Sequence, residues 1–321
     1  MVSVLTQLKS REVQMRKRKV DRAVVAITRD PLEGQAVCRA IEMLPVQEIF
    51  KTGDTVVITP NWVNTRPPET GTVVGPETLR ELIKFIKKQQ PGRIVVACGS
   101  GGDPTPKVME QTGYLHILQQ EQVEFVDTNY GPYIDLALNH SYPPATPINK
   151  LITEADVLIS FTQIKYHEEA TVSLGVKNIA LSWPPAEIHG WPKAQRGIHE
   201  RLHGFIAAMA EKIPIDLTIL SGNKGMIGTG PSKGKPVNSD IVIAGTDPVA
   251  TDVVGARLLG FMPQAVQYLY ELALRGVGEG DLKKVELKGV PLYEAEEVFS
   301  LAAYGHAVVV DQGRLKPFQL I

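Results

Sequence analysis

The sequence predicts an α/β fold in which mostly parallel strands are joined by crossover helices. Short β-branched runs alternate with helical patterns along the 321 residues, and this alternation is typical of βαβ units. Two of the runs, 55–59 and 94–97, are almost wholly apolar, which indicates strands that are covered on both faces. We expect two Rossmann-like lobes with a cleft between them.

The individual elements follow from local signals. A proline at the first helical position marks helix starts at Pro76, Pro106 and Pro248, and apolar residues at helical spacing predict an amphipathic helix over 77–88. Six prolines between 143 and 192 interrupt the periodicity, so residues 163–197 are expected to form a long irregular connection, a kind of segment that is commonly functional. The expected strands lie at 23–28, 55–59, 93–98, 123–127, 156–162, 217–220, 241–245 and 285–288.

Three segments are expected along the chain, which is long enough to bury two cores. Residues 1–22 would form a basic N-terminal tail. Residues 23–197 would form a first α/β lobe that includes the irregular connection, and residues 198–321 a second α/β lobe.

Composition excludes several classes of partner. The 34 Lys and Arg residues nearly balance 35 Asp and Glu, whereas nucleic-acid-binding domains usually carry a basic excess. Two isolated cysteines, Cys38 and Cys98, fit a reducing compartment. No apolar run approaches the roughly 20 residues of a membrane span. We therefore expect a cytoplasmic protein with a small-molecule ligand, no nucleic-acid or membrane partner, and a homo-oligomeric state that the sequence leaves open.

The first candidate site combines Lys165, His167, Lys177 and Asn178. It begins where the strand predicted at 156–162 ends, and ligands of open parallel sheets bind outside the carboxyl ends of the strands. An imidazole and a primary amine placed there can bind an anion, transfer a proton or hold a metal. The alternative is that the lysines are solvated and the imidazole satisfies a backbone group.

A second candidate is the stretch from His199 to His203, which matches the H-E-x-x-H pattern at the start of a helical segment. On a helix the two imidazoles lie one turn apart and can share a zinc ion, with the glutamate as general base. Arg201 inside the motif and the lack of an obvious third ligand argue against a zinc peptidase. A solvated helix face is the alternative.

Two glycine-rich stretches, 99–103 and 222–234, are candidates for anion binding because glycine lets backbone amides approach a ligand closely. The first contains Gly101 and Gly102 and precedes a predicted helix start, where backbone amides attract anions. The second contains Gly230 and matches neither a P-loop nor a dinucleotide fingerprint. A mobile connection between strands is its alternative.

Three further polar residues lie near these segments. Asn61 and Arg66 are on the loop after the strand at 55–59, and a guanidinium suits a bidentate contact with a carboxylate. Asp247 is explained as a helix N-cap. Asp252 lies one turn into that helix among apolar neighbours, so we expect it to be partnered or close to a site.

In their order and spacing these segments resemble the family known as domain of unknown function 362. Its members share a K-P-N strand end, a K-T-H followed by an L-K-N, a later His, a G-x-G-P-x-x-G turn and a D-P-V-A-x-D helix start. The resemblance covers roughly residues 23–290. The matching segments are 59–61, 165–167, 176–178, His199, 228–234 and 247–252.

The sequence departs from this family pattern in two ways. Relatives often carry an Asp after the strand before the glycine turn and a Glu just ahead of the turn, where this chain has Ser221 and Ile227. Many relatives also carry a ferredoxin-like cluster module, for which this chain lacks the cysteines. We therefore expect no iron–sulfur cluster.

A fainter resemblance connects the chain with the nickel-pincer lactate racemases. Their early T-R-P, their glycine-containing turn, and a catalytic His ten residues before the cofactor-holding lysine are similar to 65–67, 99–102 and the pair His167 and Lys177. The resemblance implies that Lys177 would hold a nickel-pincer cofactor. A second acid/base His of the racemases is absent from 100–106, which argues against stereoinversion.

The leading hypothesis is a DUF362-type cytoplasmic protein that binds a small anionic metabolite or cofactor between two lobes. His167 would serve as acid/base or ligand, and Lys177 as an amine that pairs with or covalently holds the bound group. A non-catalytic binding or scaffold protein, and a hydrolase that holds a divalent metal through His199 and His203, are the alternatives. Whether the chain is an enzyme is left open. The expected substrate or anion contacts are Asn61, Arg66, Gly101, Gly102, Lys165, Asn178, Gly230 and Asp252.

Overall fold

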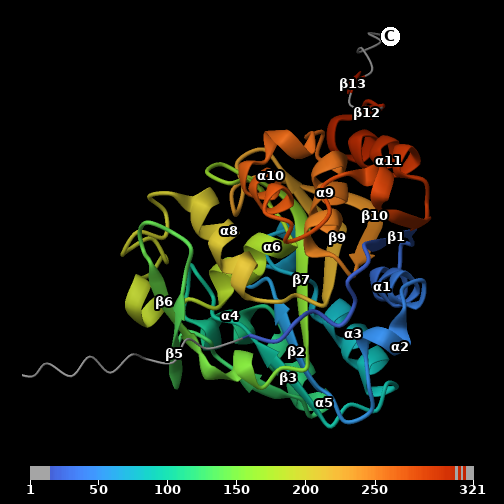
Figure 1. Ribbon diagram of the computed structural model, residues 1–321. Helices are drawn as coiled ribbons and strands as arrows, with labels where there is room; N and C mark the ends of the chain where they lie inside the picture. Colours follow the sequence, from blue (N-terminus) through green and yellow to red (C-terminus); the bar gives the residue numbers. More distant parts are fainter. Residues whose placement is uncertain (1–14, 308–309, 312–313, 316–321) are drawn as a thin grey trace, which may run out of the picture.

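The computed structural model describes residues 15–307, 310–311 and 314–315, and these form a mixed α/β structure built on one large sheet (Figure 1). Nine strands pair in the order β11-β1-β10-β9-β7-β2-β3-β4, with β8 paired to β7. Every one of the eight predicted strands is present in this sheet. The strands are β1 (Val24–Arg29), β2 (Thr55–Pro60), β3 (Arg93–Ala97), β4 (Glu124–Val126), β7 (Val157–His167), β8 (Thr171–Ser173), β9 (Leu217–Ile227), β10 (Lys235–Gly245) and β11 (Glu286–Gly289).

The sheet is mostly parallel, as predicted. Strands β9, β7, β2, β3 and β4 run parallel to one another in that order, and β1 runs parallel to β11. Strand β10 is antiparallel to both β9 and β1. Because β7 and β9 pair directly, strands from both sides of the predicted lobe boundary at residue 197 belong to one sheet. The division into two lobes stays a prediction.

Helices cover both faces of the sheet (Figure 1). Alternate residues of each strand point to opposite faces: Val24 belongs to the core cluster under α1, α3 and α5, and Val25 to the cluster under α6, α8, α9 and α10. The helices are α1 (Glu33–Glu42), α2 (Val46–Ile49), α3 (Pro76–Lys87), α4 (Thr105–Gln111), α5 (Tyr114–Glu121), α6 (Gly175–Ser182), α7 (Ala186–His189), α8 (Leu202–Lys212), α9 (Pro248–Leu258), α10 (Gln267–Leu274) and α11 (Leu292–Tyr304).

The remaining elements are short. Hairpin β5 (Tyr133–Ala137) and β6 (Ala145–Asn149) and hairpin β12 (Val310–Asp311) and β13 (Arg314–Leu315) form separate two-stranded sheets. Within the described ranges, four 3-10 turns lie at Pro68–Thr70, Lys150–Thr153, Pro263–Ala265 and Leu282–Lys284. No helix among the described residues combines the length and the apolar character that crossing a membrane requires.

The prediction of a long irregular connection over 163–197 is wrong for most of this segment. Strand β7 continues to His167, β8 pairs back onto it, and α6 and α7 follow. The prolines that suggested an irregular segment fall outside α6, since Pro184 and Pro185 come directly after its last turn. The predicted site residues Lys165 and His167 are therefore strand residues, and Lys177 and Asn178 lie on a helix.

Within the predicted basic tail, residues 1–14 lie outside the described residues, and 15–22 contact the body of the molecule. Arg16 pairs with Asp216, and Arg16 also donates to the carbonyl of Ala155 at 2.7 Å. Arg18 pairs with Asp247 at 3.1 Å. These carboxylates neutralise two residues of the basic run.

Candidate ligand-binding site

A pocket of about 270 Å³ opens where β2, β3 and β7 end. Asn61 follows β2, Gly99 follows the end of β3, and His167 is the last residue of β7, so the pocket lies at the carboxyl edge of parallel strands, as ligand sites of such sheets do. We call it the lysine pocket. Its lining comprises residues 61–64, 99, 101–102, 167, 173, 177–178, 181–182, 192–193, 199 and 231–232.

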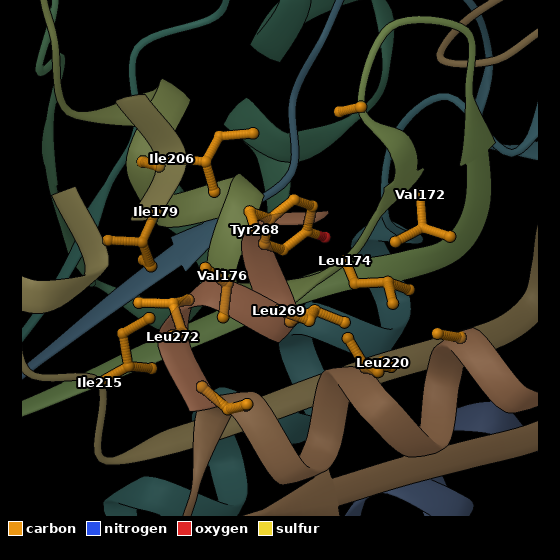
Figure 2. Close-up of a cluster of buried hydrophobic side chains, with 14 of the residues drawn as sticks. Val172, Leu174, Val176, Ile179, Ile206, Ile215, Leu220, Tyr268, Leu269 and Leu272 are labelled. Atoms are coloured by element: carbon orange, nitrogen blue, oxygen red, sulfur yellow. The ribbon is translucent and has the colours of Figure 1, made fainter. Parts of the chain in front are cut away.

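Helix α6 carries two of the predicted residues, Lys177 and Asn178, into this pocket because its other face is buried. Figure 2 shows Val176 and Ile179 of α6 in a cluster of apolar side chains from α8, α10 and the strands. The cluster fixes the rotation of the helix about its axis. The residues labelled there are Val172, Leu174, Val176, Ile179, Ile206, Ile215, Leu220, Tyr268, Leu269 and Leu272.

The first turn of α6 is anchored by Asp252 of α9. Its two carboxylate oxygens accept hydrogen bonds from the backbone amides of Gly175 and Val176, each at 2.8 Å. A Cβ atom at Gly175 would lie 2.2 Å from Cγ2 of Thr218, so only glycine allows the helix to start this close to β9. Asp252, predicted as an anion contact, is instead a residue that positions α6.

Lys177 presents a free amine to the pocket. Its side chain is 7% exposed, and Nζ makes no hydrogen bond or ion pair with any described residue. Burial lowers the pKa of Lys177 to about 8, partly offset by the charge of Glu169. Desolvation of this kind disfavours the charged ammonium form.

His167 is held as a neutral hydrogen-bond donor. Its Nδ1 accepts from the backbone amides of Glu169 at 3.1 Å and Ala170 at 3.2 Å, so the proton of the neutral ring is assigned to Nε2. Burial, followed by the charges of Lys177 and Lys165, lowers the pKa of His167 to about 2. The ring can donate to a ligand but cannot take a proton at Nε2 in this tautomer.

A chain of amides connects the pocket wall to Lys165. Nζ of Lys165 donates to Oδ1 of Asn61 at 2.5 Å and to the carbonyl of Thr72 at 3.2 Å. Nδ2 of Asn61 lies 3.5 Å from Oδ1 of Asn178, and Asn178 donates to the carbonyl of Thr59 at 2.9 Å. Lys165 therefore lies behind Asn61 and not in the pocket lining, and burial holds its pKa well below the usual value.

Lys193 is a pocket residue that the sequence did not indicate. Nζ of Lys193, a 3% exposed side chain, donates to the carbonyls of Gly99, Leu181 and Ser182 at 2.9, 3.1 and 3.2 Å. Burial lowers its pKa to about 8. Its position in the proline-rich segment after α6 gave no strand-end or glycine signal, so no pattern distinguished it from a solvated lysine.

The remaining predicted anion contacts differ in position. Gly101 and Gly102 line the pocket, but the amide of Gly102 already donates to the carbonyl of Val63 at 2.8 Å. Arg66 is exposed and donates to the carbonyl of Ser232 at the pocket rim. Gly230 lies outside the lining, where a Cβ would overlap the carbonyl oxygen of Tyr166 at 1.9 Å. Gly230 permits close backbone packing that brings the neighbouring turn to the pocket.

The helical H-E-x-x-H geometry expected for His199 and His203 is wrong. Helix α8 begins only at Leu202, so His199 lies in the preceding turn and the two imidazoles do not share a helix face. His199 lines the pocket, with Nδ1 at 2.5 Å from Oε2 of Glu169, whereas His203 packs against the ring of Tyr268. No group of three His, Cys, Asp or Glu side chains in the described part of the chain is arranged to hold a metal ion.

The lysine pocket is electropositive. Its described lining includes two buried lysines and no Asp or Glu, and a third buried lysine, Lys165, lies one layer behind. A larger groove of about 820 Å³, between α10 and the segment 279–283, contains none of the predicted site residues.

These features define an α/β protein with a cationic pocket at the carboxyl edge of a mostly parallel sheet. The chain belongs to the family described as domain of unknown function (DUF362), whose model matches residues 56–257. The thylakoid-associated protein sll1697 of Synechocystis sp. is 26% identical over 219 residues, which are 67% of this chain and 66%, just under two thirds, of that curated relative.

Two solved structures are also similar. The lactate racemase apoprotein from Thermoanaerobacterium thermosaccharolyticum matches with 19% identity and a TM-score of 0.39, over 74% of this chain and 57% of that chain. A protein from Thermotoga maritima matches with 12% identity and a TM-score of 0.39, over 64% of this chain and 52% of that chain.

Proposed function

We propose that this protein binds a small anionic metabolite in the lysine pocket. The observation that carries the proposal is the charge of the described lining, which includes the buried lysines Lys177 and Lys193 and no Asp or Glu side chain, since the carboxylates that act on these lysines, Glu169 and Asp127, lie outside it. Burying a charge without a partner is costly. A bound anion would supply the missing charge.

The unsatisfied polar groups of the pocket favour the same ligand. Several lining residues carry a side-chain donor that has no hydrogen-bond partner among the described residues, including Nζ of Lys177, Nε2 of His167, the hydroxyl of Ser173 and Nδ2 of Asn64. Carboxylate and phosphate oxygens accept several hydrogen bonds at once. The volume of about 270 Å³ corresponds to roughly nine water molecules, which suits a metabolite of comparable size.

Calorimetric titration with a panel of small carboxylates and phosphate esters tests the proposal. We expect at least one of these anions to bind, and Lys177→Met to weaken that binding by about ten- to a hundredfold, the effect of losing one charged hydrogen bond of about 1.5–3 kcal/mol. Lys107→Met, at an exposed lysine of α4, is the matched control and should bind as the wild type does. Equal binding by Lys177→Met and the wild type would refute the proposal.

A nickel-pincer group is a second candidate, and the residues present suit it in part. Lys177 has the free amine that would hold such a group. His199, with Nδ1 facing Glu169, would present Nε2 to a metal in the orientation that carboxylates commonly impose. The bound group would supply Lewis-acid or hydride chemistry. His167 does not suit the role of a base beside it, because its Nδ1 is occupied by two backbone amides. This favours ligand binding over proton abstraction.

A further inference from the structure

The three buried lysines around the lysine pocket are not equivalent. Nζ of Lys193 has three carbonyl acceptors and Nζ of Lys165 has two oxygen acceptors. Nζ of Lys177 lines the same pocket, in a 7% exposed side chain, with no acceptor among the described residues. The amines of Lys193 and Lys165 are thus occupied by hydrogen bonds within the protein, and the amine of Lys177 is free to react.

We propose that the free amine of Lys177 forms a Schiff base with the carbonyl carbon of a small 2-oxo acid bound in the lysine pocket. The inference rests on the proposed anion binding, and it narrows the ligand to an acid that also carries an aldehyde or ketone next to the carboxylate. Lys193 supplies positive charge for the carboxylate, and Lys177 supplies the nucleophile.

The surroundings of Lys177 suit this step. A nucleophilic amine must be unprotonated, and lysines gain reactivity when they are desolvated or lie beside another cation. Burial lowers the pKa of Lys177 to about 8, so that about half of the amines are neutral at pH 8. Ligand carbonyl oxygens need a donor, and the fixed Nε2 proton of His167 is available in the same pocket.

The step balances without an oxidant or reductant. The nitrogen lone pair attacks the carbonyl carbon to form the C–N bond, and the C=O π electrons move to the oxygen, which gains a proton. The resulting hydroxyl leaves as water when the carbon–nitrogen double bond forms, and the two protons that the oxygen takes up balance the two that the nitrogen loses. The products are the imine of Lys177 and one water molecule.

Borohydride trapping tests the inference. The protein is incubated with pyruvate, glyoxylate or 2-oxoglutarate, reduced with sodium borohydride, and analysed by intact mass and peptide mapping. We expect an adduct whose mass equals that of the oxo acid less one oxygen atom, located on Lys177. The adduct should be lost in Lys177→Met and Lys177→Arg and retained in Lys107→Met.

A parallel titration separates the two proposals. Propionate and lactate carry the carboxylate but no reactive carbonyl, so their binding reports anion recognition alone. Binding of these acids and of the oxo acids without a Lys177 adduct would overturn the Schiff base and leave the proposed function intact. Binding of no acid at all would overturn both. Labelling spread over surface lysines as strongly as over Lys177 would also overturn the inference. Lys177→Arg keeps the positive charge, so binding of propionate by this variant would show that the adduct is lost because the amine is absent and not because the protein is misfolded.

Discussion

The carboxylate of Asp252 on α9 holds the backbone amide of Gly175, the first residue of α6, at 2.8 Å. The second carboxylate oxygen holds the next amide at the same distance. A helix N-terminus leaves its first amides without intrahelical partners, so this contact between two helices far apart in the sequence decides where α6 begins. The reactive lysine lies two residues further on.

Replacing Asp252 with Asn should destabilise the fold and loosen Lys177. The Asn side chain keeps one acceptor oxygen but turns an NH2 group toward the second buried amide, and leaving such a donor unsatisfied costs about 1–3 kcal/mol. We expect a free energy of unfolding in urea lower by this amount, with weaker anion binding. The control is Asp135→Asn, at an exposed residue of β5, where the change should stay within about 0.5 kcal/mol. Equal stability of the two variants would contradict the anchoring role.

Anion binding should weaken with rising pH. With a pKa of about 8, the Lys177 ammonium falls from about nine-tenths to about one-tenth populated between pH 7 and pH 9. The affinity for an unreactive carboxylate such as propionate should drop by about tenfold over this window, measured by calorimetry. Lys193 titrates in the same range, so Lys177→Met should show a shallower pH dependence and not a flat one. An affinity that stays constant to pH 9 in the wild type would be inconsistent with this assignment.

His167 should remain a neutral Nε2–H tautomer at every pH at which the protein is folded. Nitrogen-15 NMR of the ring should show a protonated Nε2, an unprotonated Nδ1 and no titration above pH 5, since burial lowers the pKa of His167 to about 2. A midpoint near 6.5, or a proton on Nδ1, would contradict the donor role.

The same shift predicts a loss of stability in acid. The pKa of His167 is lower in the folded state than the unfolded value of about 6.5, so the unfolded state binds the extra proton. The contribution of His167 to the free energy of unfolding is therefore lost as the pH falls below about 6.5, by up to about 1.4 kcal/mol per pH unit. In His167→Asn, where Oδ1 can replace Nδ1 as the acceptor for Ala170, the unfolding free energy should fall less steeply between pH 6.5 and pH 5.

Much of the fold could be predicted from the sequence because apolar strands are local signals. The runs at 55–59 and 93–98 are strands at the expected positions. The end of β7 was missed because Gln163 and Lys165 are polar, and polar residues usually mark the end of a buried strand. The oxygen acceptors that allow the Lys165 amine to be buried belong to Asn61 and Thr72, which lie about a hundred residues earlier in the chain. No local sequence pattern reveals such a contact.

The candidate site was predicted only in part, because strand ends are visible in the sequence and long-range contacts are not. His167, Lys177, Asn178 and Asn61 were expected to meet, and all four line one pocket. The roles of the others depend on hydrogen bonds that spacing does not encode. Asp252 turned out to be saturated by two amides of α6, and a motif such as H-E-x-x-H has its metal-binding geometry only if the helix begins before it.

Lys193 offers the last test, because it joins the glycine turn after β3 to the final turn of α6. Its ammonium donates to the carbonyls of Gly99, Leu181 and Ser182, and carbonyls at a helix C-terminus favour a positive charge. In Lys193→Met these acceptors lose their donor, so we expect a free energy of unfolding lower by about 1–3 kcal/mol, with Lys107→Met as the unaffected control.

The pH dependence of that loss distinguishes a buried ammonium from a surface one. The folded pKa of Lys193 is about 8, below the unfolded value of about 10.4, so the unfolded state binds more protons between these limits. The stability of the wild type relative to Lys193→Met should therefore rise as the pH increases from 8 toward 10. Urea denaturation across this range measures the difference, and a gap that stays constant with pH would mean that the amine is hydrated and does not hold the pocket wall in place.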